Sequence, residues 1–148
     1  MLGVGNELNG DDGVGVVIAR RLKKHWADHA NLLSIEAGLA PENYTGLLRK
    51  FNPSDIILVD AAIMELQPGE PGWLDWTQAD GMSASTHSLP LSMVGRYLKD
   101  ELGCQVWLLG IQPAQLETGE GLSKPVRRAV KHAIIYLNEI LISLDSSK

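Results

Sequence analysis

Apolar and polar positions alternate along the chain in a way that predicts strands separated by helices. The clearest strand is 55–60, a continuous apolar and β-branched run that ends at Asp60. Runs of this kind are typical of strands that are covered on both faces in a parallel sheet. The stretch 105–111 has the same character, and shorter strands are predicted at 2–5, 32–36 and, as a short or edge strand, 73–76.

Helical periodicity fills the segments between these strands. Over 13–26 the apolar residues recur every three or four positions and are backed by Arg and Lys, which predicts an amphipathic helix. Further helices are predicted from Pro41 to about 51, from 89 to 102, and over a long terminal segment that Ser123 caps. Because strands and helices alternate, we expect an α/β sandwich with right-handed crossovers, in which residues 1–148 form one domain.

Composition and charge exclude several classes of protein. The net charge of −5 and the pI near 5.3 argue against a nucleic-acid-binding surface, which would need a concentrated basic face. No apolar run approaches the roughly 20 residues of a membrane span. The one cysteine, Cys104, cannot form an internal disulfide, which agrees with the reducing cytoplasm. Its place at the start of an apolar strand predicts a raised thiol pKa and low reactivity.

The glycine-rich stretch 3–15 places two consecutive carboxylates, Asp11 and Asp12, after the first strand and before the first helix. Ligands gather at this position in α/β folds. A dinucleotide-binding fingerprint would need a third glycine where Leu8 stands, and an acidic pair would repel a pyrophosphate. The alternative is helix capping. Since consecutive side chains point in different directions, one carboxylate can cap while the other faces a site.

Two further residues are candidates for the same site. Asp60 ends an apolar strand, where burying a carboxylate is costly unless it is paired, hydrogen-bonded or bound to a cation. His87 lies in a loop of small residues that leads into a helix. The alternatives are a turn aspartate and a surface histidine. Together with Asp12 they would form an O, O, N donor set suited to nickel or zinc.

Other catalytic arrangements are less well supported by the sequence. His25 and His29 are one helical turn apart, but Trp26 stands where a zinc peptidase motif has its glutamate, so we expect them on a solvated surface. His132 has no visible partner. No Gly-x-Ser-x-Gly sequence exists to anchor a serine nucleophile.

Five ordered motifs give the chain a resemblance to a known family. They are Gly3-Val4-Gly5-Asn6 with Gly10-Asp11-Asp12-Gly13-Val14-Gly15, then Ala40-Pro41-Glu42-Asn43, Val59-Asp60-Ala61, Thr86-His87-Ser88-Leu89-Pro90-Leu91, and Leu109-Gly110-Ile111-Gln112-Pro113. Nearly end to end, the sequence resembles the maturation endopeptidases of nickel-iron hydrogenases, most closely the type that processes the large subunit of hydrogenase 3.

The resemblance implies a fold, a reaction and a site. The fold would be a three-layer α/β sandwich with a twisted, mostly parallel five-stranded sheet between helices. The reaction would be removal of the C-terminal extension from the nickel-loaded precursor of the hydrogenase large subunit, in the cytoplasm. Asp12 rather than Asp11 would bind the nickel together with Asp60 and His87, and these three would carry the catalytic site. We expect the substrate to deliver the nickel, and the loops 40–44 and 112–121 to contact it.

Two alternative functions remain open, and the sequence departs from the family pattern at one loop. A non-hydrolytic module of the same fold would bind nickel or the precursor without cutting it, and a small nucleotide-binding domain is a third possibility. Relatives tend to carry a Gly-Gly pair where this chain has Ala37-Gly38. If Ala37 had to adopt a positive φ angle, its backbone would be strained.

Overall fold

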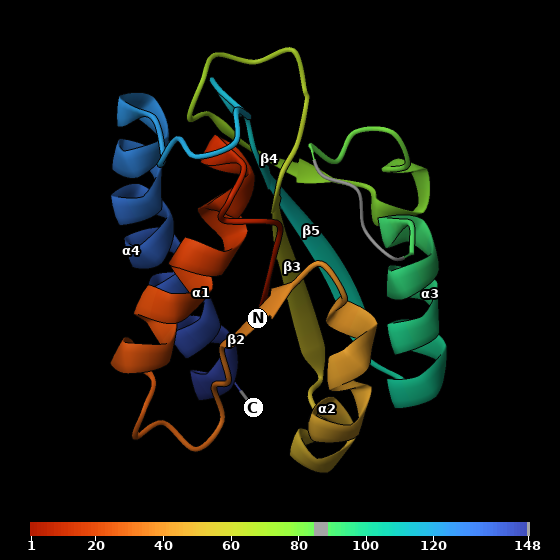
Figure 1. Cartoon of the computed structure of the whole chain (residues 1–148). Coiled ribbons are helices and arrows are strands. Elements are labelled where there is room, and N and C mark those ends of the chain that lie inside the picture. Colours follow the sequence, from red (N-terminus) through yellow and green to blue (C-terminus); the bar gives the residue numbers. More distant parts are fainter. Residues whose placement is uncertain (85–88, 148) are drawn as a thin grey trace.

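Five strands form a single sheet that is covered by helices on both faces (Figure 1). The computed structural model describes residues 1–84 and 89–147. The strand order is β2-β1-β3-β5-β4, and only β4 runs antiparallel to its neighbour. The strands are β1 (Leu2–Val4), β2 (Ile35–Gly38), β3 (Asp55–Ala61), β4 (Pro71–Leu74) and β5 (Gln105–Ile111).

Helices cover the sheet in two pairs, as Figure 1 shows. One face carries α1 (Val14–His25) and α4 (Lys124–Ser146), and the other carries α2 (Thr45–Phe51) and α3 (Leu91–Leu102). Three short 3-10 helices complete the described structure: η1 (Gly10–Gly13), η2 (Pro41–Tyr44) and η3 (Trp76–Gln78). This architecture confirms the predicted α/β fold with a mostly parallel five-stranded sheet between helical layers. No helix among the described residues is both long enough and apolar enough to cross a membrane.

The core has two layers because β3 and β5 send alternate side chains to opposite faces of the sheet. Ile56 and Leu58 pack in the layer beneath α2 and α3, whereas Ile57 and Val59 pack in the layer beneath α1 and α4. These side chains are at most 4% exposed. Burial on both faces is why 55–60 reads as a continuous apolar run.

Two glycines set the close packing of α1 on the sheet. A Cβ atom added to Gly15 would lie 2.1 Å from the carbonyl oxygen of Val59 and 2.5 Å from that of Val4. A Cβ added to Gly3 would lie 2.0 Å from the carbonyl oxygen of Gly15. The first helix therefore rests directly on the backbone of the first and third strands.

The shorter elements differ from their predicted positions. The second strand is not 32–36 but Ile35–Gly38, because its ladder with β1 begins where Leu2 pairs with Ile35. Leu32 and Leu33 precede this ladder, and their side chains pack against the two core layers instead. The single helix predicted from Pro41 is divided into η2 and α2, and the edge strand lies at 71–74 rather than 73–76.

The departure at Ala37-Gly38 causes no backbone strain. Ala37 is a buried residue of β2 without a positive φ angle, and the left-handed conformation falls on Gly38, whose φ is 65°. A glycine adopts that conformation without a steric penalty. The chain thus keeps its glycine at the one position of the pair that requires it.

Candidate active site

The candidate site lies where β1 and β3 end side by side. These strands are parallel neighbours, with Leu2 opposite Leu58 and Gly3 opposite Val59. The turn that contains Asp12 follows β1, and Asp60 is the penultimate residue of β3. Both carboxylates therefore emerge at the carboxyl edge of the sheet, where open α/β sheets bind ligands.

Asp12 is held inside the turn that follows β1. It belongs to η1, is 1% exposed, and accepts a hydrogen bond on Oδ2 from the backbone N–H of Asn6 at 3.0 Å. That bond closes the turn from within, so the side chain has a fixed orientation. Helix capping was the alternative explanation of its position, but the N-cap residues of η1 and α1 are Asn9 and Gly13.

Asp60 is equally buried and is held by Ser83. Its side chain is 1% exposed, and the Ser83 hydroxyl donates to Oδ2 at 2.6 Å. The segment 82–84 runs antiparallel to the end of β3, with the Ala84 N–H donating to the Ala61 carbonyl at 3.0 Å. Sequence analysis missed Ser83, because a lone serine in a loop carries no periodic signal.

Gly5 brings the two aspartates to a common place. A Cβ atom added to Gly5 would lie 1.9 Å from the carbonyl oxygen of Asp12 and 3.6 Å from Oδ1 of Asp60. Gly5 also has a φ angle of 129°, which L side chains rarely adopt. Only glycine can occupy this position, and its missing side chain lets the turn that carries Asp12 approach the end of β3.

His87 lies outside the described residues, so the structure does not place the third member of the predicted set. The described chain stops at Ala84, beside the end of β3, and resumes at Leu89. Within residues 1–84 and 89–147, no three His, Cys, Asp or Glu side chains come together in a group that could hold a metal ion. The convergence of Asp12, Asp60 and His87 on one ion stays a prediction.

Asp11 points away from Asp12 and has a separate role. Its fully buried carboxylate accepts hydrogen bonds from the backbone N–H groups of Ala114 at 2.8 Å and Gln115 at 3.0 Å. It also accepts from the N–H of Ser123 at 2.7 Å and from its hydroxyl at 2.8 Å. Ser123 does occupy the N-cap position of α4, but its side chain makes no capping bond, because the hydroxyl is bound to Asp11 instead.

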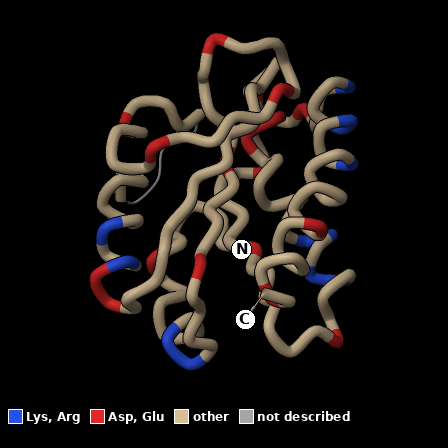
Figure 2. Tube along the Cα trace, turned by 180° about the vertical axis from the view of Figure 1, so that it is seen from behind, with Lys and Arg blue, Asp and Glu red and all other residues tan. Residues whose placement is uncertain are grey.

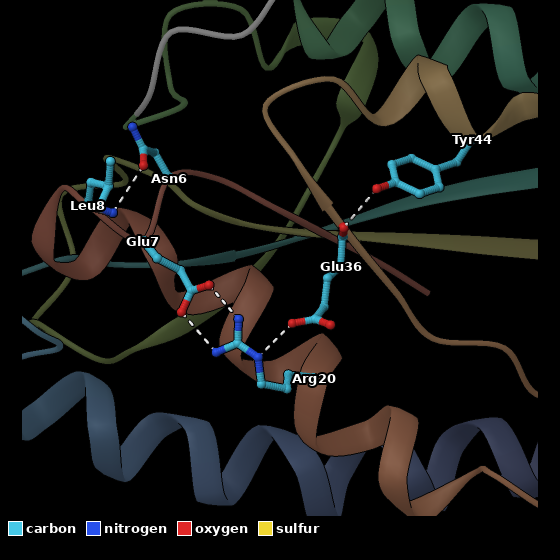
Figure 3. A network of polar contacts seen from close by, with 6 residues as sticks. All are labelled: Asn6, Glu7, Leu8, Arg20, Glu36 and Tyr44. Atoms are coloured by element: carbon cyan, nitrogen blue, oxygen red, sulfur yellow. Dashed lines mark hydrogen bonds and ion pairs between the residues drawn. The ribbon is translucent and has the colours of Figure 1, made fainter.

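Arg20 on α1 ties the turn after β1 to β2 (Figure 3). Its guanidinium donates to both carboxylate oxygens of Glu7, and its Nε donates to Glu36 at 2.6 Å. Hydrogen bonding by Arg20 lowers the pKa of Glu7 below its ordinary value, and the same bonds raise the pKa of Arg20. Because these side chains are between 31% and 45% exposed, the network adds no more than about 1 kcal/mol per pair to stability.

Comparison with known proteins assigns the chain to a family. The family model for hydrogenase maturation proteases matches residues 16–140, which is most of the chain. The chain belongs to the hydrogenase maturation protease family. The part of the sequence that the family model matches includes Asp60 and His87 and begins just after Asp12.

Individual relatives agree with this assignment. The hydrogenase 3 maturation protease of Escherichia coli K12 is 35% identical over 132 residues, covering 88% of this chain and 83% of that protein. The NiFe hydrogenase maturation protease HycI from Thermococcus kodakarensis KOD1, known from a crystal structure, is 33% identical in sequence and superimposes with a TM-score of 0.84. The match covers 95% of this chain and 89% of that chain. A crystal structure of a hydrogenase 3 maturation protease is also 33% identical, with a TM-score of 0.75 and coverages of 90% and 84%.

The charges of this hydrogenase maturation protease are segregated. All Lys and Arg residues within 1–147 lie in α1, α2, α3 and α4, and the loops 5–13, 62–70 and 112–123 carry only Asp and Glu among charged residues. Figure 2 shows acidic residues on the loops at the upper end of the molecule, and basic residues both on a helix at the upper right and at the lower end. The loops at the carboxyl edge of the sheet are therefore acidic, although the start of α4 brings basic residues to the same end, where Arg127 donates to the Leu122 carbonyl.

The other candidate residues of the protease lie apart from this edge. His25 is exposed at the end of α1, and His29 in the following turn has its Nε2 3.7 Å from Oδ2 of Asp145. His132 is exposed on α4. Cys104 is buried, and burial raises the pKa of its thiol, as predicted. Neither His25 and His29 nor Cys104 shares the surroundings of Asp12 and Asp60.

Proposed function

We propose that this protease removes the C-terminal extension from the nickel-loaded precursor of the large subunit of a NiFe hydrogenase. Family membership and the hydrogenase 3 relative support this reaction. The observation that carries the proposal is the packing of Asp12 and Asp60 on Gly5, because it concentrates two buried carboxylates where neighbouring strands end. The cytoplasm is the proposed compartment, where the precursor would be met.

The donor set suits the nickel ion that the substrate carries. Asp12 and Asp60 would offer carboxylate oxygens and His87 an imidazole nitrogen, ligand types that bind borderline divalent ions. When bound, such an ion polarises a carbonyl, lowers the pKa of a bound water or orients the substrate. With three ligands from the protease, positions stay open for donors from the substrate itself.

Asn6 and Ser83 hold the two carboxylates of the proposed site. The Asn6 N–H holds Oδ2 of Asp12, and the Ser83 hydroxyl holds Oδ2 of Asp60. Partners of this kind fix the direction in which a carboxylate meets a metal ion, and their loss commonly weakens metal affinity or activity. If either carboxylate is not a ligand, the same fixed orientation suits it to accept a proton from the attacking water.

The direct test is to incubate nickel-loaded precursor with the protein and to follow the released C-terminal peptide by mass. We expect His87→Ala and the isosteric change Asp60→Asn to abolish release, while the circular dichroism and melting temperature of His87→Ala stay close to those of the wild type. His132→Ala, which alters an exposed histidine of α4, serves as the matched control and should keep full activity.

Two results would contradict the proposal in different ways. Full activity of His87→Ala would remove this residue from the site. Tight binding of the nickel-loaded precursor without any cleavage would favour the non-hydrolytic binding module of the same fold. Family membership favours cleavage over that alternative.

A further inference from the structure

The loop that joins β3 to β4 is built around a single side chain. In the sheet, β5 lies between these two strands, so residues 62–70 must pass over the carboxyl end of β5 (Figure 1). The residue that directly follows β5 is Gln112, whose side chain is buried at 9% exposure. The loop begins two residues after Asp60, so whatever holds it also acts on the end of the strand that carries this carboxylate.

Gln112 is bonded to this loop at four places. Its side-chain Oε1 accepts from the backbone N–H groups of Met64 at 2.7 Å and Leu66 at 3.3 Å. Its backbone carbonyl accepts from the Gly69 N–H at 2.8 Å, and its own N–H donates to the Glu70 carbonyl at 2.9 Å. One buried residue thus supplies hydrogen-bond partners from the beginning of the loop to its end.

The two side-chain bonds stabilise an uncommon backbone conformation. Glu65 has a φ angle of 59°, in the left-handed region that residues other than glycine rarely adopt. The turn at Glu65 brings the N–H groups on either side of it to one oxygen atom of Gln112. Such a conformation persists only where surrounding contacts impose it, and residues of this kind cluster at functional sites.

The beginning of the same loop supports the segment that orients Asp60. The Ile63 N–H donates to the Met82 carbonyl at 2.7 Å, and the next residue, Ser83, donates its hydroxyl to Oδ2 of Asp60 at 2.6 Å. Release of residues 64–66 would remove the anchor on one side of Ile63, so its pairing with Met82 would loosen. The Ser83 hydroxyl would then no longer meet the Asp60 carboxylate at a fixed angle.

We propose that Gln112 is a positioning residue of this protease, which fixes the loop after β3 and, through Ser83, the orientation of Asp60. The inference rests on the proposed function, because it takes Asp60 as a residue of the site. Glutamine suits this position because its amide oxygen has two lone pairs, one for each backbone donor. This role also accounts for the glutamine of the motif Leu109-Gly110-Ile111-Gln112-Pro113.

The kinetic test compares Gln112→Met, which has a side chain of similar length but no amide oxygen, with Val106→Ala. Val106 is a buried residue near the opposite end of β5, so its truncation weakens the core without touching the loop. Both variants should melt at a lower temperature than the wild type. At a temperature where both are folded, only Gln112→Met should lower kcat for the nickel-loaded precursor, by about tenfold, because small displacements of a group in the site reduce the rate strongly.

The values of KM should stay close to that of the wild type in both variants, and Gln112→Glu, which keeps an acceptor oxygen, should restore most of kcat. A Gln112→Met variant with unchanged kcat would contradict the inference, as would an equal loss of kcat in Val106→Ala. A loss confined to KM would show that the loop binds the precursor and does not position Asp60.

The variant Ser83→Ala tests the route by which Gln112 acts. If Gln112 orients Asp60 through Ser83, Gln112→Met should lower kcat much less in the Ser83→Ala background than in the wild type, since the two changes then remove the same effect. Losses that multiply in the double variant would overturn this route.

Amide hydrogen exchange tests the anchoring of the loop without any cleavage. In Gln112→Met, the N–H groups of Met64, Leu66 and Ile63 should all exchange faster than in the wild type, because local opening becomes easier. Unchanged exchange at Ile63 would mean that the anchor does not reach the segment that holds Ser83. A wild-type protein that releases no peptide, with exchange at Ile63 responding as expected, would contradict the proposed function alone.

Discussion

Asp11 and Asp12 show how neighbouring residues of one type acquire different roles. They lie in a 3-10 helix, in which successive side chains are separated by about 120°. Asp11 consequently points to the loop 112–123, and Asp12 points back to Asn6. The sequence predicts that the two directions differ, but it does not reveal which carboxylate meets the distant loop. That assignment depends on a contact between residues separated by a hundred positions.

Asp11 should be the more important of the two for stability. Replacing it with alanine leaves three backbone N–H groups and the Ser123 hydroxyl without their acceptor, and we expect the free energy of unfolding to fall by about 3 kcal/mol. Asp11→Asn should cost about 2 kcal/mol, because an amide has one acceptor oxygen and turns an NH2 group towards donors. Urea unfolding followed by circular dichroism measures both losses.

Ser123→Ala is the control for this prediction. It removes one donor while the carboxylate keeps its three backbone partners, so its cost should be about 1 kcal/mol or less. An Asp11→Asn variant as stable as the wild type would show that the buried carboxylate does not brace the loop.

At the scale of elements, the contact of α1 with the sheet depends on the absence of a side chain. Gly15→Ala would place a methyl group 2.1 Å from the carbonyl oxygen of Val59, and backbone atoms on both sides prevent it from moving aside. We expect a loss of about 3 kcal/mol or more in the free energy of unfolding, or failure to fold, because α1 would have to separate from β1 and β3. Thermal unfolding of the purified variant measures the effect.

Gly46→Ala in α2 offers a matched comparison. A Cβ atom there would meet nothing within 4 Å, and the residue lies inside a helix without a positive φ angle. Alanine should therefore stabilise the protein by about 0.5–1 kcal/mol. A Gly15→Ala variant that melts at the wild-type temperature would mean that helix and sheet can separate at little cost.

The elements that the sequence predicted well are those whose packing produces a repeating pattern. β3 is buried on both faces, and β5 is buried on both faces only over its second half, because Gln105 and Trp107 are exposed. Both strands still read as apolar runs, while α1 and α4 bury one stripe and repeat every three or four residues. β2 has four residues and pairs with a three-residue strand. Its limits are therefore set by its hydrogen bonds to β1 and not by a repeating pattern of apolar residues. The partnership of Asp60 with Ser83 escaped prediction for the same reason, since it depends on the antiparallel pairing of Ala62 with Ser83.

At the scale of the whole molecule, the fold separates a body of helices and core layers from an edge of loops that carries the candidate site. Helices carry the basic residues and shield the two core layers, whereas the loops at the carboxyl edge hold the buried aspartates and expose further carboxylates (Figure 2). The described residues contain no group of three His, Cys, Asp or Glu side chains that could hold a metal ion, and His87 lies outside them. The proposal that the substrate delivers the nickel ion predicts that Asp12, Asp60 and His87 bind the ion only together with donors from the precursor.

The isolated protease should therefore bind nickel weakly. If Asp12, Asp60 and His87 are the protein's share of the ligands, the substrate must supply the rest, and equimolar Ni²⁺ alone should leave the melting temperature unchanged. If the protease had its own nickel site, free Ni²⁺ at a hundred times the Kd of that site would instead add about 2.7 kcal/mol to the free energy of unfolding. Differential scanning calorimetry with and without Ni²⁺ measures the difference, and His87→Ala shows whether any shift arises at this site. A large shift that His87→Ala abolishes would mean that the protease holds its own nickel ion, so that recognition of the precursor could not depend on nickel delivered by the substrate.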